Sequence, residues 1–286
     1  MAKTEQVSFL ATFPNFPNLP AKHSNIAYSN PRTPLSPISP LLRGVFGLVI
    51  ATLLCTFALP AVSDTSAGLS PHSAQYKLVL DGKGRFETKA IRKLTSDAEQ
   101  QWSVSLKAST FIASFSEITR FRLDDQGITP LTYDKKSKVF TKKTERQLRY
   151  DWSGLQLTNG EQQWPLSLTQ PIYDSLSYQL QLQLDLAQGK PSLSYQVNTG
   201  EQLETYQFER IGNEKVSVGY GTLDTVRVER TYAHTTNAAN ATSEKGAGKT
   251  TRLWFAPSLN YQLVKLERVN KKGQTTHLTL EKMLSR

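Results

Sequence analysis

The stretch WSVSLK at residues 102–107 alternates apolar and polar side chains, and this pattern decides the fold class. In an extended chain its three apolar residues fall on one side, and its two serines and its lysine fall on the other. The same period of two occurs in YKLVL at residues 76–80. Alternation of this kind is typical of antiparallel sheets with one dry and one wet face.

Short turn signals separate the alternating runs. Glycine supplies positive φ, and Asp and Asn hydrogen-bond their own backbone. The signals are Asp81-Gly82, Asp124-Asp125-Gln126-Gly127, Ser153-Gly154, Asn159-Gly160, Gly212-Asn213 and Lys272-Gly273. The apolar phase shifts between Ile118 and Phe121, which predicts a bulge or register change near Arg120. We expect a mainly β fold, a single antiparallel meander that forms a barrel, a half-barrel or a sandwich.

Residues 173–188, YDSLSYQLQLQLDLAQ, are compatible with a strand and with a helix. Leucines at every second position favour a strand. Gln and Leu are good helix formers, Asp174 and Ser175 suit a helix N-terminus, and Gly189 suits a helix end. We expect one helix near 174–188, lying across the sheet.

The N-terminal part has a different character. Residues 1–43 contain half of the prolines and no regular period, so we expect a disordered flank. A charge-free apolar run follows at 44–59, and small residues follow it up to Ser63. Residues 44–63 therefore resemble the apolar region and cleavage site of a signal peptide, and an uncleaved single-span anchor is the alternative.

A flank of this length is unusual ahead of a signal peptide. A start codon near Leu41 or Leu42 would explain it, in which case residues 1–40 are not translated. Residues 64–286 then form a single β-rich domain, which we expect in the periplasm or, with an uncleaved anchor, on the periplasmic side of the inner membrane. Within this domain the small, polar residues 233–250 predict a long loop.

No constellation for catalysis or cofactor binding stands out. The chain has one cysteine, and the histidines of the domain, His72, His234 and His277, are far apart in sequence. Gly248-Lys249-Thr250 lacks the upstream glycine of a phosphate loop. We expect no catalytic, cofactor-binding or metal-binding residues.

The densest feature is basic. Residues 135–149 contain seven basic residues and one acidic residue, Glu145. The basic residues are Lys135, Lys136, Lys138, Lys142, Lys143, Arg146 and Arg149. A second cluster comprises Lys83, Arg85, Lys89, Arg92 and Lys93. Both clusters fit solvated hairpins whose lysines discourage edge-to-edge pairing. They also fit contacts to an anionic envelope lipid or polysaccharide, whereas a nucleic-acid partner is not expected.

The C-terminal LWFAP at 253–257, with Tyr261 and LVKLE at 263–267 after it, resembles the closing motif of the DUF3108 family, a group of bacterial envelope proteins of unknown function. Where that family has Asp-Pro-Leu-Ser, this chain has DSLS at 174–177, which weakens the helix start slightly. The resemblance implies a secreted β-rich domain and brings no catalytic residues. The motif residues, which we expect to be structural, are Glu117, Pro130, Tyr133, Asp174, Leu176, Ser177, Gly221, Trp254, Pro257 and Glu267.

These observations predict an exported, non-enzymatic envelope protein. A curved sheet would hold an acyl chain, an anionic component or a segment of an envelope protein, and the basic hairpins would steer the protein to its target. The alternatives are a polysaccharide or peptidoglycan hydrolase with unidentified carboxylates and a structural accessory subunit of an envelope complex.

Overall fold

The computed structural model describes residues 68–285 apart from 83–84, 98–100 and 232–248. These residues form fifteen strands, the helix α1 (Ser177–Ala187) and the 3₁₀-helix η1 (Pro257–Leu259). The strands are β1 (His72–Asp81), β2 (Arg85–Ser96), β3 (Gln101–Ser109), β4 (Ala113–Asp124), β5 (Gly127–Val139), β6 (Lys142–Asp151), β7 (Gln156–Thr158), β8 (Gln163–Pro165), β9 (Ile172–Tyr173), β10 (Leu193–Asn198), β11 (Leu203–Val218), β12 (Gly221–Thr231), β13 (Thr250–Ala256), β14 (Gln262–Val269) and β15 (Thr275–Ser285).

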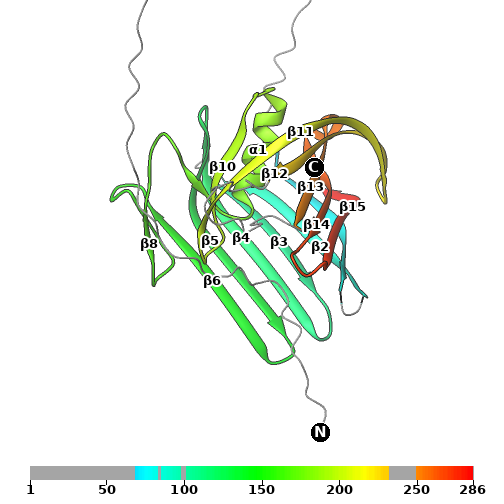
Figure 1. The fold of residues 1–286 in the computed structure, drawn as a ribbon, viewed down its shortest axis with the longest axis horizontal. Helices are drawn as coiled ribbons and strands as arrows, with labels where there is room; N and C mark the ends of the chain where they lie inside the picture. The colour runs from blue at the N-terminus through cyan, green and yellow to red at the C-terminus, as the bar shows by residue number, and fades with distance from the viewer. Residues whose placement is uncertain (1–67, 83–84, 98–100, 232–248, 286) are drawn as a thin grey trace, which may run out of the picture. The chain divides into compact units, whose positions relative to one another are not determined.

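All fifteen strands belong to one sheet (Figure 1), whose order is β8-β7-β6-β5-β4-β3-β2-β1-β15-β14-β13-β12-β11-β10-β9. Two meanders run outward from the centre, where β1 pairs with β15. Every pairing among the described strands is antiparallel except that of β9 with β10. The mainly β, antiparallel fold class with a single α-helix is thereby confirmed, and the sheet stays open.

Most of the turn signals lie between strands, and one does not. Asp124 pairs with Gly127 across the turn between β4 and β5, as expected. Gly212, in contrast, lies inside β11 at a register shift against β12, so its prediction as a turn was wrong. Its φ of 150° suits a bulge, which inserts a residue without ending the strand. The predicted irregularity near Arg120 is confirmed, because the register of β4 against β5 shifts between Arg120 and Phe121.

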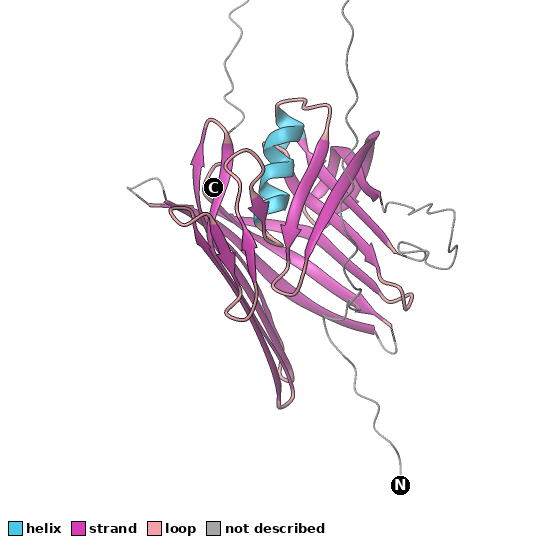
Figure 2. Ribbon diagram, turned by 60° about the vertical axis from the view of Figure 1, so that its left-hand side comes forward, coloured by secondary structure: helices cyan, strands magenta, loops and turns pink. Residues whose placement is uncertain are grey.

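The ambiguous leucine-rich segment forms α1, as expected. In a helix, leucines at every second position fall on two opposite sides of the axis, and such a helix must be buried on both sides. Figure 2 shows α1 in the hollow of the curved sheet, and Leu180, Leu182, Leu184 and Leu186 are all buried. The helix ends before Gly189, whose φ is 66°.

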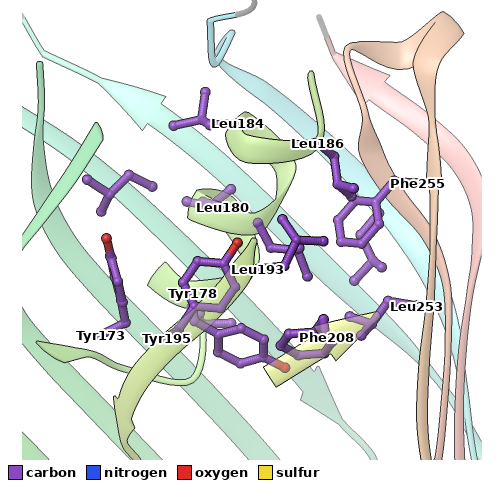
Figure 3. Close-up of a cluster of buried hydrophobic side chains, with 14 of the residues drawn as sticks. Tyr173, Tyr178, Leu180, Leu184, Leu186, Leu193, Tyr195, Phe208, Leu253 and Phe255 are labelled. Atoms are coloured by element: carbon purple, nitrogen blue, oxygen red, sulfur yellow. The ribbon is translucent and has the colours of Figure 1, made fainter. Parts of the chain in front are cut away.

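The main hydrophobic core lies between α1 and the inner face of the sheet. The leucines of α1 belong to one cluster with side chains of β3, β4 and β5, from one meander, and of β10 to β14, from the other. Figure 3 shows Leu186 close to Phe255, and the ring of Tyr178 stacks on Phe208 with centroids 5.9 Å apart. In the described residues, the concave face that the sequence suggested as a ligand holder is therefore occupied by α1.

A second core forms where the hairpin of β11 and β12 arches back toward β15 (Figure 1). The amide of Tyr220, at the hairpin turn, donates a 3.1 Å hydrogen bond to the carbonyl of Leu280. Trp254 and Val216 are buried in this core with Tyr76 of β1.

Several expectations concern residues outside the described ranges. They are the flank 1–43, the apolar segment and cleavage site 44–63, and nearly all of the loop 233–250. Neither helix of the described part of the chain has the length and hydropathy that a membrane span requires.

Candidate anionic-surface interface

The predicted basic cluster forms one hairpin. Lys135, Lys136 and Lys138 lie on β5, and Lys142, Lys143, Arg146 and Arg149 lie on β6. Their neighbours divide them into two groups. Four cations are engaged in ion pairs, and the pairs are Lys135–Glu117 at 3.2 Å, Lys136–Glu145 at 3.6 Å, Arg146–Glu201 at 2.6 Å and Arg149–Asp134 at 2.7 Å. These four contribute to holding the hairpin in the fold.

The other three lysines, Lys138, Lys142 and Lys143, surround the turn of the hairpin. All three are exposed, and among the described residues none has an ion-pair partner. Lys138 lies directly opposite Lys143 in the β5–β6 register, an arrangement of like charges that costs free energy. The turn therefore carries a concentrated positive charge that the fold does not neutralise.

Large apolar side chains project from the same end of the sheet. Phe140, in the turn between β5 and β6, is 66% exposed. In the neighbouring turn between β3 and β4, Phe111 is fully exposed and Ile112 is 41% exposed. The backbone amide of Phe140 donates a 2.8 Å hydrogen bond to the carbonyl of Ile112. We call the two turns, 110–112 and 140–141, the apolar tip; they lie at the lower end of the sheet in Figure 1, away from α1.

The backbone at Phe140 is unusual for a side chain of this size. Its φ is 53°, in the left-handed region that favours glycine or asparagine. Because Val139 pairs with Lys142, Phe140 is the first of two central residues in a tight hairpin turn. A bulky aromatic residue in this conformation stores about 1–2 kcal/mol of strain. Residues held in sparsely populated backbone conformations cluster at functional sites.

Sequence reasoning located the lysines and missed the apolar tip. The available signal was the segment KSKVFTKK at 136–143, where an apolar aromatic residue occupies the centre of a basic hairpin. Phe111 follows an alternating strand and carried no periodic signal of its own, because turn residues lie outside the period of two.

The motif residues Glu117, Tyr133, Asp174 and Ser177 lie close together between α1 and the sheet. The hydroxyl of Tyr133 donates to Glu117 Oε1 at 3.0 Å. Burial raises the pKa of the Tyr133 phenol well above its ordinary value, and the charge of Glu117 adds to the rise. This phenol therefore stays protonated and acts as a hydrogen-bond donor.

Asp174 joins the start of α1 to β4. Its Oδ1 accepts hydrogen bonds from Thr119 Oγ1 at 2.6 Å and from the amides of Leu176 and Ser177 at 2.9 and 3.0 Å. Its Oδ2 accepts from Ser177 Oγ at 2.8 Å. Burial raises the pKa of Asp174, and these donors oppose the rise. The arrangement orients the helix in the sheet.

Arg92 was expected to be solvated as part of the second basic cluster, but its side chain is buried. It is 3% exposed and points inward from β2. Its Nη1 donates a hydrogen bond to Gln179 Oε1 at 3.5 Å. Tyr76 also lies close to its guanidinium group. No carboxylate pairs with it among the described residues, and it is unavailable for an outer surface.

The remaining motif residues take part in packing, turns, hydrogen bonds and ion pairs of the fold. The carbonyl of Pro130 accepts from Trp152 Nε1 at 2.7 Å, Leu176 is buried, and Gly221 has a φ of 141°. Trp254 donates to Glu214 and packs under Lys265, whose Nζ lies 4.4 Å from the ring centroid. Pro257 begins η1, and Glu267 pairs with Lys265 at 2.9 Å. In the described residues, no cluster of His, Cys, Asp and Glu could hold a metal ion.

Comparison with known proteins gives a family. Several solved structures are similar at low identity, among them the following two. The beta-barrel-like protein of domain of unknown function DUF1849 from Brucella abortus has 10% identity and a TM-score of 0.49, with 76% of this chain and 98% of that chain covered. A putative outer membrane lipoprotein-sorting protein domain from Vibrio parahaemolyticus has 11% identity and a TM-score of 0.24, with 77% and 86% covered.

No curated protein matches the sequence. The profile of DUF3108, described as a protein of unknown function, matches residues 73–279, which run from β1 into β15. The chain therefore belongs to the DUF3108 family.

Proposed function

We propose that this chain is an exported, non-enzymatic envelope protein that attaches reversibly to an anionic lipid surface through the apolar tip. The supporting observation is the combination of Phe111, Ile112 and Phe140 on two hydrogen-bonded turns with unpaired lysines beside them. Single exposed apolar residues are common on protein surfaces, but a contiguous apolar patch with a cationic rim is typical of an interaction site.

The magnitudes support attachment. A phenylalanine side chain that leaves water gains about 1.5–3 kcal/mol. A lysine near an anionic membrane contributes about 1 kcal/mol. Two phenylalanines and three lysines therefore supply about 6–9 kcal/mol before the cost of association, a gain of the same order as that of a single acyl chain, which gives marginal and reversible membrane binding.

The proposal places the ligand on the tip instead of the concave face, because α1 and its leucines fill that face in the described residues. An acidic polysaccharide would satisfy the lysines but would leave the phenylalanines exposed to water. The apolar segment at 44–59 supports export to the periplasm, or anchoring in the inner membrane when it is not cleaved.

Vesicle flotation of the purified protein tests the proposal. We expect binding to vesicles of phosphatidylcholine with phosphatidylglycerol and much weaker binding to phosphatidylcholine alone. Replacing both Phe111 and Phe140 with serine should weaken binding at least tenfold. Leu168→Ser removes a side chain that is 77% exposed in the loop between β8 and β9, and it should leave binding unchanged.

The unaltered protein and every variant have the same N-terminus, whether or not residues 44–59 are removed on export, so that segment does not account for a difference between them. The proposal is wrong if the double variant binds as the unaltered protein does, or if binding does not depend on lipid charge. Capture of an envelope protein in place of lipid would support the accessory-subunit alternative.

A further inference from the structure

An open cavity of about 510 Å³ lies beside the apolar tip and is lined by residues of β1, β2, β3 and β4. It is lined by Gln75, Lys89, Ile91, Lys107, Ala108, Ser109, Ser114, Phe115 and Ser116. Ser109 and Ser114 flank the turn that carries Phe111 and Ile112. A group bound in the cavity would therefore lie next to the surface that we assign to the membrane.

The strand register explains why these residues gather. Lys107 pairs with Ser116, and Ser109 pairs with Ser114, so the four lie on one face of the β3–β4 hairpin. The pairing of β2 with β3 ends at Ala90 and Ala108, and Lys89 follows just beyond the last pair. The hydroxyl of Thr88 donates to the carbonyl of Ser109 at 3.2 Å, which keeps β2 close to β3 at this point.

The chemistry of the lining suits a phosphate. Two ammonium groups and three hydroxyls can donate hydrogen bonds, and no acidic residue lines the cavity. Among the described residues, Lys89 and Lys107 have no ion-pair partner, whereas Lys77 on the adjacent strand pairs with Glu87 at 2.8 Å. The positive charge of the two lysines therefore remains available to a ligand.

The size and the apolar part of the lining indicate more than a free ion. Ile91 pairs with Lys107 and adds apolar surface on the same face as the lysines, and the volume falls in the range of about 300–1,000 Å³ that is typical of small-molecule sites. We propose that the cavity binds the phosphomonoester headgroup of a lipid in the membrane that the apolar tip engages. This inference rests on the proposed function and adds a lipid preference to it.

The test compares two double variants with the same change of charge. Lys89→Gln with Lys107→Gln removes the cavity ammonium groups, and Lys271→Gln with Lys272→Gln removes two exposed lysines at the β14–β15 turn, outside the lining of the cavity. Vesicles contain either phosphatidic acid, a phosphomonoester, or phosphatidylglycerol, a phosphodiester, at matched surface charge. Thermal unfolding confirms that each variant is folded.

We expect the unaltered protein to bind phosphatidic acid vesicles at least tenfold more tightly than phosphatidylglycerol vesicles. The cavity variant should lose this preference, and the β14–β15 variant should keep it. An unaltered protein without the preference, or equal losses in both variants, would overturn the inference. Inorganic phosphate that binds as tightly as phosphatidic acid would show a free-phosphate site and overturn the lipid assignment.

Failure of the proposed function is distinguishable from failure of this site. Phe111→Ser combined with Phe140→Ser should weaken binding to both kinds of vesicle while the preference for phosphatidic acid persists. If the unaltered protein bound neither kind of vesicle, calorimetry would still measure whether soluble glycerol phosphate binds in the cavity. Binding that requires Lys89 and Lys107 would support the headgroup site, and absence of binding would overturn it.

Discussion

The backbone amide of Phe140 donates a 2.8 Å hydrogen bond to the carbonyl of Ile112, and this bond joins the turns of two successive hairpins. The exposed aromatic side chains of Phe111 and Phe140 are consequently held at one end of the sheet before any partner is present. A surface arranged in advance loses less conformational entropy on binding.

Phe140→Asn should stabilise the fold and weaken lipid binding. Asparagine tolerates the φ of 53° better than phenylalanine does, so the free energy of unfolding should rise by about 1 kcal/mol. Urea unfolding measures the first effect, and vesicle flotation measures the second. Phe111→Asn is the control, since Phe111 does not have a positive φ: its binding should fall while its stability stays within about 0.5 kcal/mol. Equal stability changes in both variants would contradict the strain at Phe140.

Lys143→Glu should also separate stability from binding. The new carboxylate would lie opposite Lys138 and replace a repulsion with an attraction, which should raise the free energy of unfolding by about 0.2–1 kcal/mol. Binding to anionic vesicles should weaken, and its decline with added salt should become less steep. Lys272→Glu makes the same charge change at the β14–β15 turn and should affect binding much less. A loss of stability in Lys143→Glu would refute the repulsion.

Asp174→Ala should destabilise the fold by about 2–4 kcal/mol, because it removes the acceptor of Thr119 and of two amides at the start of α1. Asp174→Asn keeps an acceptor oxygen and should cost about half as much. Chemical denaturation of both variants measures the difference. Asp224→Ala, at an exposed pair with Lys215, should cost less than about 1 kcal/mol. A cost for Asp174→Ala as small as that for Asp224→Ala would exclude the proposed orienting role.

Stability should decrease as the pH falls through the ordinary His72 pKa of 6.5. Burial and the charge of Arg92 lower the pKa of the folded-state imidazole, whereas its hydrogen bond to Ser70 raises it. The unfolded chain then binds the proton first, so the contribution of His72 is fully present above 6.5 and is lost as the pH falls toward the lower folded value. His72→Gln should flatten this part of the curve of unfolding free energy against pH. Parallel curves for the two proteins would show that His72 does not contribute.

The period of two was sufficient to predict the strands, because one face of each strand must be dry in any sheet that covers a core. The helix was harder, since its leucines suit a strand equally well until the sheet is seen to surround them. Gly212 and Asn213 are residue types typical of a turn, and only the pairing of β11 with β12 shows that they lie at a bulge.

The candidate site was predictable in part. The basic hairpin is visible in the sequence, but the partner of Arg146, Glu201, is distant in the chain and belongs to no local pattern. Arg92 looks like a surface cation in its cluster, but in the fold it is buried with Gln179 of α1 and Tyr76 of β1 as neighbours. The cavity combines residues of four strands, so its lining could not be assembled from spacing.

The pairing of β1 with β15 at the middle of the sheet has a consequence for the order of folding. One neighbour of β1 in the sheet is β2, which follows it directly in sequence. The other neighbour is β15, residues 275–285, which is far away in sequence. Contacts between such distant segments make folding slow. Until residues 275–285 have folded, the edge of β1 that faces β15 has no partner strand, so the two meanders join into one continuous sheet late in folding.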